Sequence, residues 1–96
     1  MKSEEILIKL RQLKPHIFRK FKAKEIQLFG SYVRKEQNTE SDIDLLVDFE
    51  EGADLFHLTG LAIFLEGEFQ QKVDVVSKQA LRSELKKSVL NESILI

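Results

Sequence analysis

Cysteine is absent from the 96 residues of this chain, and proline, glycine and tryptophan are scarce or missing. Without cysteine the chain has no disulfides and no thiolate metal sites, so a bound metal ion must take oxygen ligands or one of the two histidines. One proline and four glycines are too few for a fibrous or low-complexity chain. These absences point to an ordinary folded protein whose metal chemistry favours hard cations.

The chain also lacks the long apolar run of a signal peptide or a membrane span. Its N-terminal segment mixes acidic and basic residues with apolar ones from the start. We therefore expect a cytoplasmic protein that contacts no membrane. Ninety-six residues leave room for one modest core, so we predict a single domain over residues 1–96.

Charge is unevenly distributed along the chain. Residues 1–24 carry eight Lys or Arg against two Glu, and residues 25–96 carry seven against fourteen Asp or Glu. A basic N-terminal segment suits phosphates or an acidic partner surface, and it equally suits the solvated face of a helix. Both interpretations stay open on the sequence alone.

The spacing of apolar residues predicts where the helices lie. Ser3 before two acidic residues is typical of a capped helix start, and the helical pattern breaks at Pro15, which begins a second short helical stretch after a hinge. A short helical stretch is predicted at 32–35. An amphipathic helix capped by Asp54 follows later, and a last helix covers 80–90.

Three strands are predicted from β-branched and aromatic content, at residues 25–29, 42–49 and 73–76. The middle strand has adjacent apolar residues at its centre, which indicates burial on both faces of a sheet. A polar loop is predicted at 36–41, and residues 93–96 are left unassigned. Helices and strands in this alternation make an α/β domain.

Gly30 and Ser31 form a corner between the first predicted strand and a helical start. Such a corner offers backbone N–H groups and a hydroxyl to phosphate oxygens, because glycine lets the backbone approach closely. On its own, a Gly-Ser corner is more often a plain turn.

Asp42 and Asp44 stand two residues apart on the second predicted strand, so both carboxylates project from one face. Two like charges repel, and a divalent cation between them converts the repulsion into a binding site. An Asp-x-Asp pair on an exposed strand is also a common accident. Asp48, beside Glu50 and Glu51, fits a solvated surface better.

Asp74 interrupts the otherwise apolar strand 73–76, where aspartate is depleted. A buried carboxylate needs a partner, which a neighbouring metal site, Lys72 or Arg82 would supply. The residues alone leave the metal and the ion-pair interpretations equally open.

The residues just described resemble a known signature. Gly30-Ser31-Tyr32-Val33-Arg34, a polar loop and then Ser41-Asp42-Ile43-Asp44-Leu45-Leu46-Val47 are similar to the signature of the polymerase β nucleotidyltransferase superfamily. The compact length and the strand at 72–76 before a short last helix resemble the minimal nucleotidyltransferases (MNT) of bacteria and archaea. The resemblance covers about residues 22–96. In one departure, Lys35 follows the arginine where the family usually has glycine, which brings the local turn into question.

The resemblance implies a minimal polymerase β-type fold of the α/β (α+β) class, with a mixed three-stranded sheet flanked by about four helices. Residues 25–96 would form the catalytic core, preceded by basic helices at 1–24. Asp42, Asp44 and Asp74 would hold two Mg²⁺ ions, and Asp74 would also help to deprotonate an attacking hydroxyl.

The resemblance also assigns the nucleotide site. Gly30 and Ser31 would cradle the phosphates of ATP, the nucleotide substrate. Arg34 matches the family's arginine, and either a phosphate or an acidic neighbour would be its partner.

Minimal nucleotidyltransferases of this kind resemble the antitoxins of toxin–antitoxin pairs whose other member is a HEPN-domain ribonuclease. The resemblance implies transfer of AMP from ATP to a tyrosine hydroxyl of that HEPN protein, with no direct contact to nucleic acid. One alternative is adenylylation of a small hydroxylated molecule such as an aminoglycoside, in an oligomer that builds the acceptor pocket from two chains. Another is a non-catalytic subunit that neutralises its partner by forming a hetero-oligomeric complex.

Overall fold

The computed structural model describes residues 2–36 and 41–96. Its elements follow the chain in the order α1 (Ser3–Phe21), β1 (Ala23–Phe29), α2 (Ser31–Arg34), β2 (Ile43–Phe49), α3 (Leu55–Phe69), β3 (Val73–Ser77), the 3₁₀ helix η1 (Lys78–Ala80), α4 (Ser83–Asn91) and β4 (Ile94–Leu95). The loop predicted at 36–41 falls mostly on residues 37–40, which lie outside the described residues. Within the described ranges, no helix is both long and apolar enough to cross a membrane.

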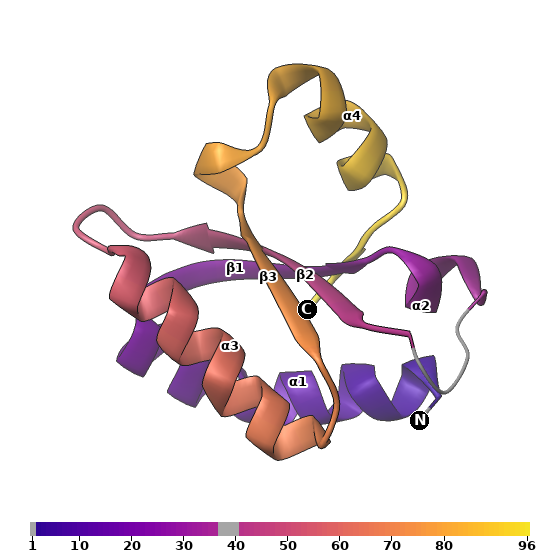
Figure 1. Ribbon diagram of the computed structural model, residues 1–96, viewed down its shortest axis with the longest axis horizontal. Coiled ribbons are helices and arrows are strands. Elements are labelled where there is room, and N and C mark those ends of the chain that lie inside the picture. The colour runs from indigo at the N-terminus through magenta and orange to yellow at the C-terminus, as the bar shows by residue number, and fades with distance from the viewer. Residues whose placement is uncertain (1, 37–40) are drawn as a thin grey trace.

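The strands form one mixed sheet in the order β3-β2-β1-β4 (Figure 1). β2 runs parallel to β3 and antiparallel to β1, and β4 pairs antiparallel with β1. The prediction of three strands was therefore wrong by one, because residues 93–96 contribute β4. A two-residue strand is too short to show an alternating pattern, and only its pairing with β1 defines it.

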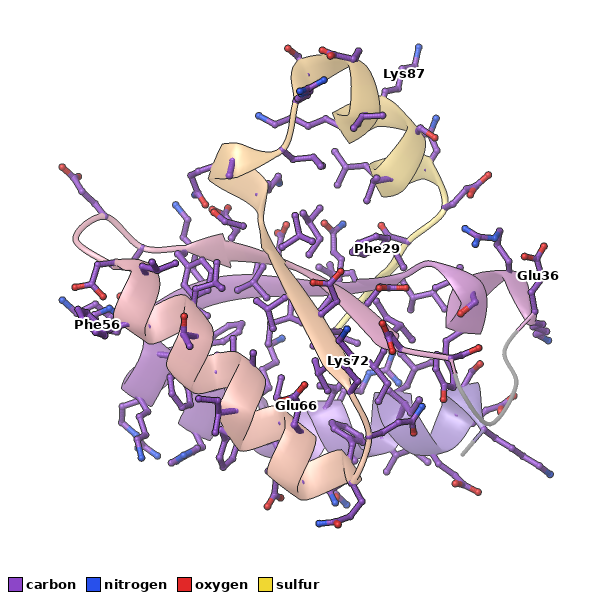
Figure 2. All side chains as sticks on the ribbon, viewed as in Figure 1. Phe29, Glu36, Phe56, Glu66, Lys72 and Lys87 are labelled. Carbon is purple, nitrogen blue, oxygen red and sulfur yellow. The ribbon has the colours of Figure 1, made fainter. Side chains whose placement is uncertain are left out.

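Two helices cover one face of this sheet. α1 and α3 lie side by side against it, and α4 lies on the other side of the sheet (Figure 1). Side chains fill the space between the two helices and the strands (Figure 2), in one apolar cluster that includes Ile17, Leu45 and Leu61. Leu46 is also buried, so the centre of β2 is buried on both faces, as predicted.

α1 is a single helix, contrary to the break predicted at Pro15. Its buried residues Ile6, Leu10, Ile17 and Phe21 continue one stripe at helical spacing on both sides of the proline. Burial of this stripe outweighs the loss of the backbone hydrogen bond that proline cannot donate. The hinge inferred from the proline is therefore absent from α1.

Ser3 also differs from its predicted role as a helix cap. The residue at the cap position is Lys2, and no side-chain hydrogen bond caps the helix there. The hydroxyl of Ser3 instead donates to the backbone carbonyl of Tyr32, 2.7 Å away. It fastens the start of α1 to α2.

Two basic residues of α1 pack onto the chain itself. Lys9 Nζ donates to the backbone carbonyl of Glu68 and lies 5.4 Å from the centre of the Phe69 ring. Lys14 Nζ lies 5.4 Å from the centre of the Phe18 ring. For these two lysines the contacts favour the structural interpretation of the basic segment.

Replacing Pro15 with alanine is expected to stabilise the protein. Pro15 is exposed, and alanine restores an N–H donor for the carbonyl of Arg11. Proline in a helix interior costs about 3 kcal/mol relative to alanine, and the more flexible unfolded chain returns roughly 0.4–1 kcal/mol of that. We expect the free energy of unfolding in urea to rise by about 2 kcal/mol. Gln12→Ala, also exposed on α1, is the control with almost no expected change, and a fall in stability of Pro15→Ala would contradict the prediction.

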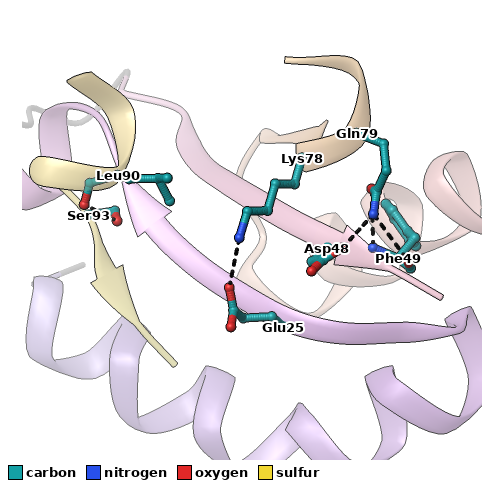
Figure 3. Close-up of polar contacts among 7 residues, drawn as sticks. All are labelled: Glu25, Asp48, Phe49, Lys78, Gln79, Leu90 and Ser93. Atoms are coloured by element: carbon teal, nitrogen blue, oxygen red, sulfur yellow. Dashed lines mark hydrogen bonds and ion pairs between the residues drawn. The ribbon is translucent and has the colours of Figure 1, made fainter. Parts of the chain in front are cut away.

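The connection from β3 to α4 is fastened across the sheet (Figure 3). Lys78 Nζ lies 3.4 Å from Glu25 Oε1, and Gln79 Nε2 donates to the backbone carbonyl of Phe49 at 3.2 Å. These contacts hold the chain in η1 after β3. The helix predicted over 80–90 therefore begins later, as α4.

Candidate active site

The end of β1 and the starts of β2 and β3 meet at one end of the sheet. In the parallel pairing of β2 with β3, Asp44 stands opposite Asp74, and in the antiparallel pairing with β1 it stands opposite Phe29. Gly30 follows Phe29 directly. Strand register thus brings together the predicted phosphate corner and two of the three predicted carboxylates.

Both carboxylates project from the sheet face that lies away from α1 and α3. Ile43 and Leu45 are buried in the core, and side chains alternate along a strand, so Asp44 points to the other face. The same alternation between the buried Val73 and Val75 directs Asp74 to that face.

Asp74 is exposed, so the prediction that it is buried was wrong. The strand around it is apolar because alternate residues face the core, and this alternation leaves the side chain of Asp74 in solvent. Lys72, considered as its partner, pairs instead with Asp42, with 3.9 Å between Nζ and Oδ2. Asp42 lies just before β2, and its carboxylate is directed toward that lysine.

Asp44 carries the clearest electrostatic signal of the site. Burial raises the pKa of its carboxyl above the ordinary value, the carboxylates of Asp74 and Asp42 raise it further, and the guanidinium of Arg34 lowers it. Negative charge is therefore crowded around Asp44. A cation bound among these carboxylates would relieve the repulsion.

Carboxylate oxygens are the ligands that Mg²⁺ and other hard cations prefer. The donor chemistry around Asp44 and Asp74 therefore fits such an ion. Among residues 2–36 and 41–96, however, no group of three His, Asp or Glu side chains is arranged to hold a metal. The three predicted ligands are neighbours in the fold without forming a closed site.

Gly30 is required at its position for two reasons. Its φ of 79° and ψ of −151° are open to glycine and to almost no other residue. A Cβ at Gly30 would lie 3.0 Å from Cγ of Asp44 and would overlap the carboxylate oxygen. Ser31 is the first residue of α2, and the carbonyl of Gly30 accepts hydrogen bonds from the N–H groups of Val33 and Arg34, both at 3.1 Å. The corner therefore lies directly against the carboxylate.

A pocket of about 300 Å³ opens between this corner and α4. It is lined by Phe29, Gly30, Arg34 and Asp44 and, from α4 and its end, by Ser88, Val89 and Glu92. The α4 residues were not among the site residues predicted from the sequence. Their spacing predicts an amphipathic helix, and only the return of the chain over the sheet places them at the site.

Arg34 pairs with Glu36 at the surface, with 3.2 Å between Nε and Oε2. The two side chains are 46% and 63% exposed, and ion pairs this exposed contribute only about 0–1 kcal/mol. The acidic neighbour left open by the sequence therefore exists, and Arg34 can exchange it for a phosphate with little loss.

Tyr32 and Gln71 join the segments that carry the site. Tyr32 is buried under the corner, with 1% of its surface exposed. Its hydroxyl accepts a hydrogen bond from Gln71 Nε2, which also donates to the backbone carbonyl of Ser41, 2.8 Å away. Sequence reasoning missed both residues, although the place of Tyr32 inside the signature was a signal.

Known proteins share this sequence and fold. The family model described as a nucleotidyltransferase domain matches residues 10–96. The chain is 41% identical over 93 residues to the protein adenylyltransferase MntA of Thermococcus cleftensis, covering 97% of this chain and 94% of that one. The chain belongs to the nucleotidyltransferase family.

Solved structures agree with this assignment. The nucleotidyltransferase superimposes on a "putative minimal nucleotidyltransferase" with a TM-score of 0.86 at 35% identity, covering 98% of this chain and 95% of that one. It is also similar to a chain in the complex of tri-AMPylated Shewanella oneidensis HEPN toxin with MNT antitoxin, with a TM-score of 0.64 at 25% identity, covering 97% of this chain and 67% of that one. The first of these confirms the minimal nucleotidyltransferase fold.

Lys35 is the residue at which the sequence departs from the signature that it resembles. Its φ of 58° and ψ of 35° are left-handed, and its N–H donates to the carbonyl of Ser31. The turn therefore has the conformation that glycine adopts most easily, although the residue is lysine. Lysine at this position therefore strains the turn.

Lys35→Gly is expected to stabilise this nucleotidyltransferase. The left-handed conformation costs a non-glycine residue about 1–2 kcal/mol, and the greater freedom of glycine in the unfolded chain offsets roughly 0.4–1 kcal/mol. We expect the free energy of unfolding to rise by about 0.5–1 kcal/mol in urea denaturation. Lys35→Ala removes the same side chain and keeps the strain, so equal stability of the two variants would contradict this account.

Proposed function

We propose that this nucleotidyltransferase transfers AMP from ATP to a tyrosine hydroxyl of a HEPN-domain partner protein, and so acts as the antitoxin of a toxin–antitoxin pair. The observation that carries the proposal is the register that sets Asp44 against Asp74 and Gly30. Two relatives support the acceptor class. The similar chain of Thermococcus cleftensis is a protein adenylyltransferase, and the similar complex from Shewanella oneidensis holds an AMPylated HEPN toxin.

We infer that Asp42, Asp44 and Asp74 hold two Mg²⁺ ions when nucleotide binds. Bound Mg²⁺ neutralises charge on the triphosphate and polarises the phosphorus that is attacked. The crowding of negative charge around Asp44 supports this assignment. Asp42 must leave Lys72 to join the site, and the loss is small because the two side chains are 40% and 73% exposed.

The other residues of the corner bind and orient the nucleotide. The backbone N–H groups that follow Gly30 and the hydroxyl of Ser31 donate to phosphate oxygens, and Arg34 exchanges Glu36 for a phosphate. Holding the acceptor hydroxyl in line with the α-phosphorus removes much of the entropic part of the barrier.

The chemical step transfers one adenylyl group from ATP to the acceptor hydroxyl. Asp74 accepts the proton of the acceptor hydroxyl, and the oxygen of that hydroxyl forms a bond to the α-phosphorus of ATP. The bond from this phosphorus to the oxygen that bridges to the β-phosphate breaks, and pyrophosphate leaves with that bond's electron pair. The exposed position of Asp74 supports this role, because an acceptor side chain carried by another protein must reach it.

The test is the intact mass of a candidate HEPN-domain partner, the product of the adjacent gene where it belongs to that class, after incubation with this chain, ATP and Mg²⁺. We expect a gain of whole adenylyl units, located on tyrosine by peptide mass spectrometry. The control is Asp42→Asn/Asp44→Asn, with which the mass should not change, and the same is expected when EDTA replaces Mg²⁺.

Other outcomes would redirect the proposal. A stable complex with no gain in mass would favour the non-catalytic binding subunit. Consumption of ATP that depends on an aminoglycoside and needs no partner protein would favour a small-molecule adenylyltransferase.

A further inference from the structure

The exposed residues of α3 are all uncharged. They are Leu55, Phe56, Thr59, Ile63 and Gly67. The three large apolar side chains, Leu55, Phe56 and Ile63, are 73%, 86% and 64% exposed, and Figure 2 shows Phe56 at the outer edge of the molecule beside the first turn of α3. A surface helix ordinarily turns a polar face to solvent. An apolar strip in that place marks an interaction surface.

The spacing along this strip is self-complementary. Phe56, Gly60, Ile63 and Gly67 follow one another at intervals of four, three and four residues, so they lie along one side of the helix. Large and small residues alternate. When two copies of α3 pack antiparallel about a two-fold axis, Phe56 meets Gly67 of the partner subunit.

Gly67 has no reason within its own chain to be glycine. A Cβ there would meet no atom within 4 Å, and its φ is not left-handed. Glycine inside a helix destabilises the helix relative to alanine. Gly60 differs, because a Cβ there would lie 3.2 Å from Cε1 of Phe21. No contact within one chain requires this glycine, but packing of a large side chain from another molecule against Gly67 does.

We propose that two copies of this chain form a dimer through antiparallel packing of α3. The exposed residues of the strip carry no charge, so no like charges meet at its centre. The carboxylates of the active site face away from α3, so the dimer leaves that site open.

The area of the strip sets the expected strength of the dimer. The three large side chains offer on the order of 400 Å² of apolar surface per copy, about half of the roughly 800 Å² that each partner contributes to a standard interface. We therefore expect a dissociation constant in the micromolar range.

The test is analytical ultracentrifugation of the full chain from about 1 μM to about 1 mM, a range that brackets micromolar affinity. We expect a monomer–dimer equilibrium. Phe56→Asp and Gly67→Leu should each weaken the dimer by at least about tenfold without changing the circular dichroism spectrum. Ile8→Glu is the matched control, since Ile8 is 56% exposed on α1 outside the strip, and it should leave the dimer unchanged.

The variant Gly67→Ala tests whether Gly67 acts in the dimer interface or only within the monomer. Alanine favours the helix, so the monomer should become more stable to urea while the dimer becomes weaker. A monomer over the whole concentration range would overturn the proposal and leave the strip for a different protein. A dimer that Phe56→Asp and Gly67→Leu do not weaken would overturn it as well. Neither result depends on transferase activity.

Discussion

Asp44→Asn is expected to reduce AMP transfer by roughly 10²–10³-fold or more, the loss seen when one group that stabilises transition-state charge is removed. Asparagine has the size of aspartate, so it fits against Gly30 and Asp74, and the fold should persist. Its amide is a poor ligand for Mg²⁺ and cannot neutralise the ion. The initial rate of adenylyl transfer, measured by partner mass, checks the prediction.

The matched control for this variant is Asp48→Asn. Asp48 lies on β2 with the same alternation as Asp44 and at the other end of the strand, and we expect its replacement to leave the transfer rate unchanged. Undiminished transfer by Asp44→Asn would contradict the assignment of Asp44 as a ligand of Mg²⁺.

The stability of Asp44→Asn relative to the wild type, measured without metal, should depend on pH in a defined direction. Because burial and the neighbouring carboxylates raise the pKa of Asp44, the folded protein holds this proton more tightly than the unfolded chain does. Ionisation of Asp44 therefore lowers stability as pH rises from about 4 through the raised pKa.

Asparagine cannot ionise, so the variant escapes this penalty. We expect Asp44→Asn and the wild type to differ little below pH 4 or so, with the variant gaining relative stability as pH rises. Urea denaturation in EDTA at several pH values measures the difference. A difference that stays constant or shrinks with rising pH would contradict the electrostatic account, and added Mg²⁺ should stabilise only the wild type.

Gly30→Ala is expected to destabilise the protein and to reduce transfer strongly. The backbone conformation at Gly30 costs another residue about 1–3 kcal/mol, and the new methyl group would overlap the carboxylate of Asp44. Either the backbone or Asp44 must move. We expect urea denaturation to show a loss of about 2 kcal/mol or more, and the transfer rate to fall as far as in Asp44→Asn.

Gly52→Ala is the control for Gly30→Ala, because it introduces backbone strain without a clash at the active site. Gly52 also has a left-handed φ, of 91°, and a Cβ there would meet only Lys22 Nζ, at 3.8 Å. This variant should lose stability through strain and keep its transfer rate under conditions where it is folded. Equal loss of transfer in the two glycine variants would show that reduced stability, and not the contact with Asp44, explains the effect of Gly30→Ala.

The sequence-based predictions were confirmed where local geometry decides the structure. Gly30 follows a predicted strand and Asp44 alternates with apolar residues of another, so the local setting of each could be expected from the chain itself. Asp54 is a comparable case. Its side chain accepts hydrogen bonds from the N–H groups of Phe56 and His57 and caps α3, as predicted.

The errors occurred where partners distant in sequence decide the outcome. A proline removes one hydrogen bond and so predicts a break at Pro15, whereas burial of the apolar stripe on both sides of it keeps α1 continuous. The apolar neighbours of Asp74 predict burial, although alternation leaves its side chain exposed. The two residues of β4 are a strand only because β1 has a free edge beside them.

The sequence by itself determined the family and the strand-and-corner context of Gly30 and Asp44. These depend on alternation, backbone conformation and spacing over a few residues. Tertiary structure alone decided that Asp44 faces Asp74, that Gln71 joins Tyr32 to Ser41, and that α4 forms a wall of the pocket. The physical reason is that strand register and helix placement are set by burial of apolar side chains over the whole chain, and no short stretch of sequence contains that information.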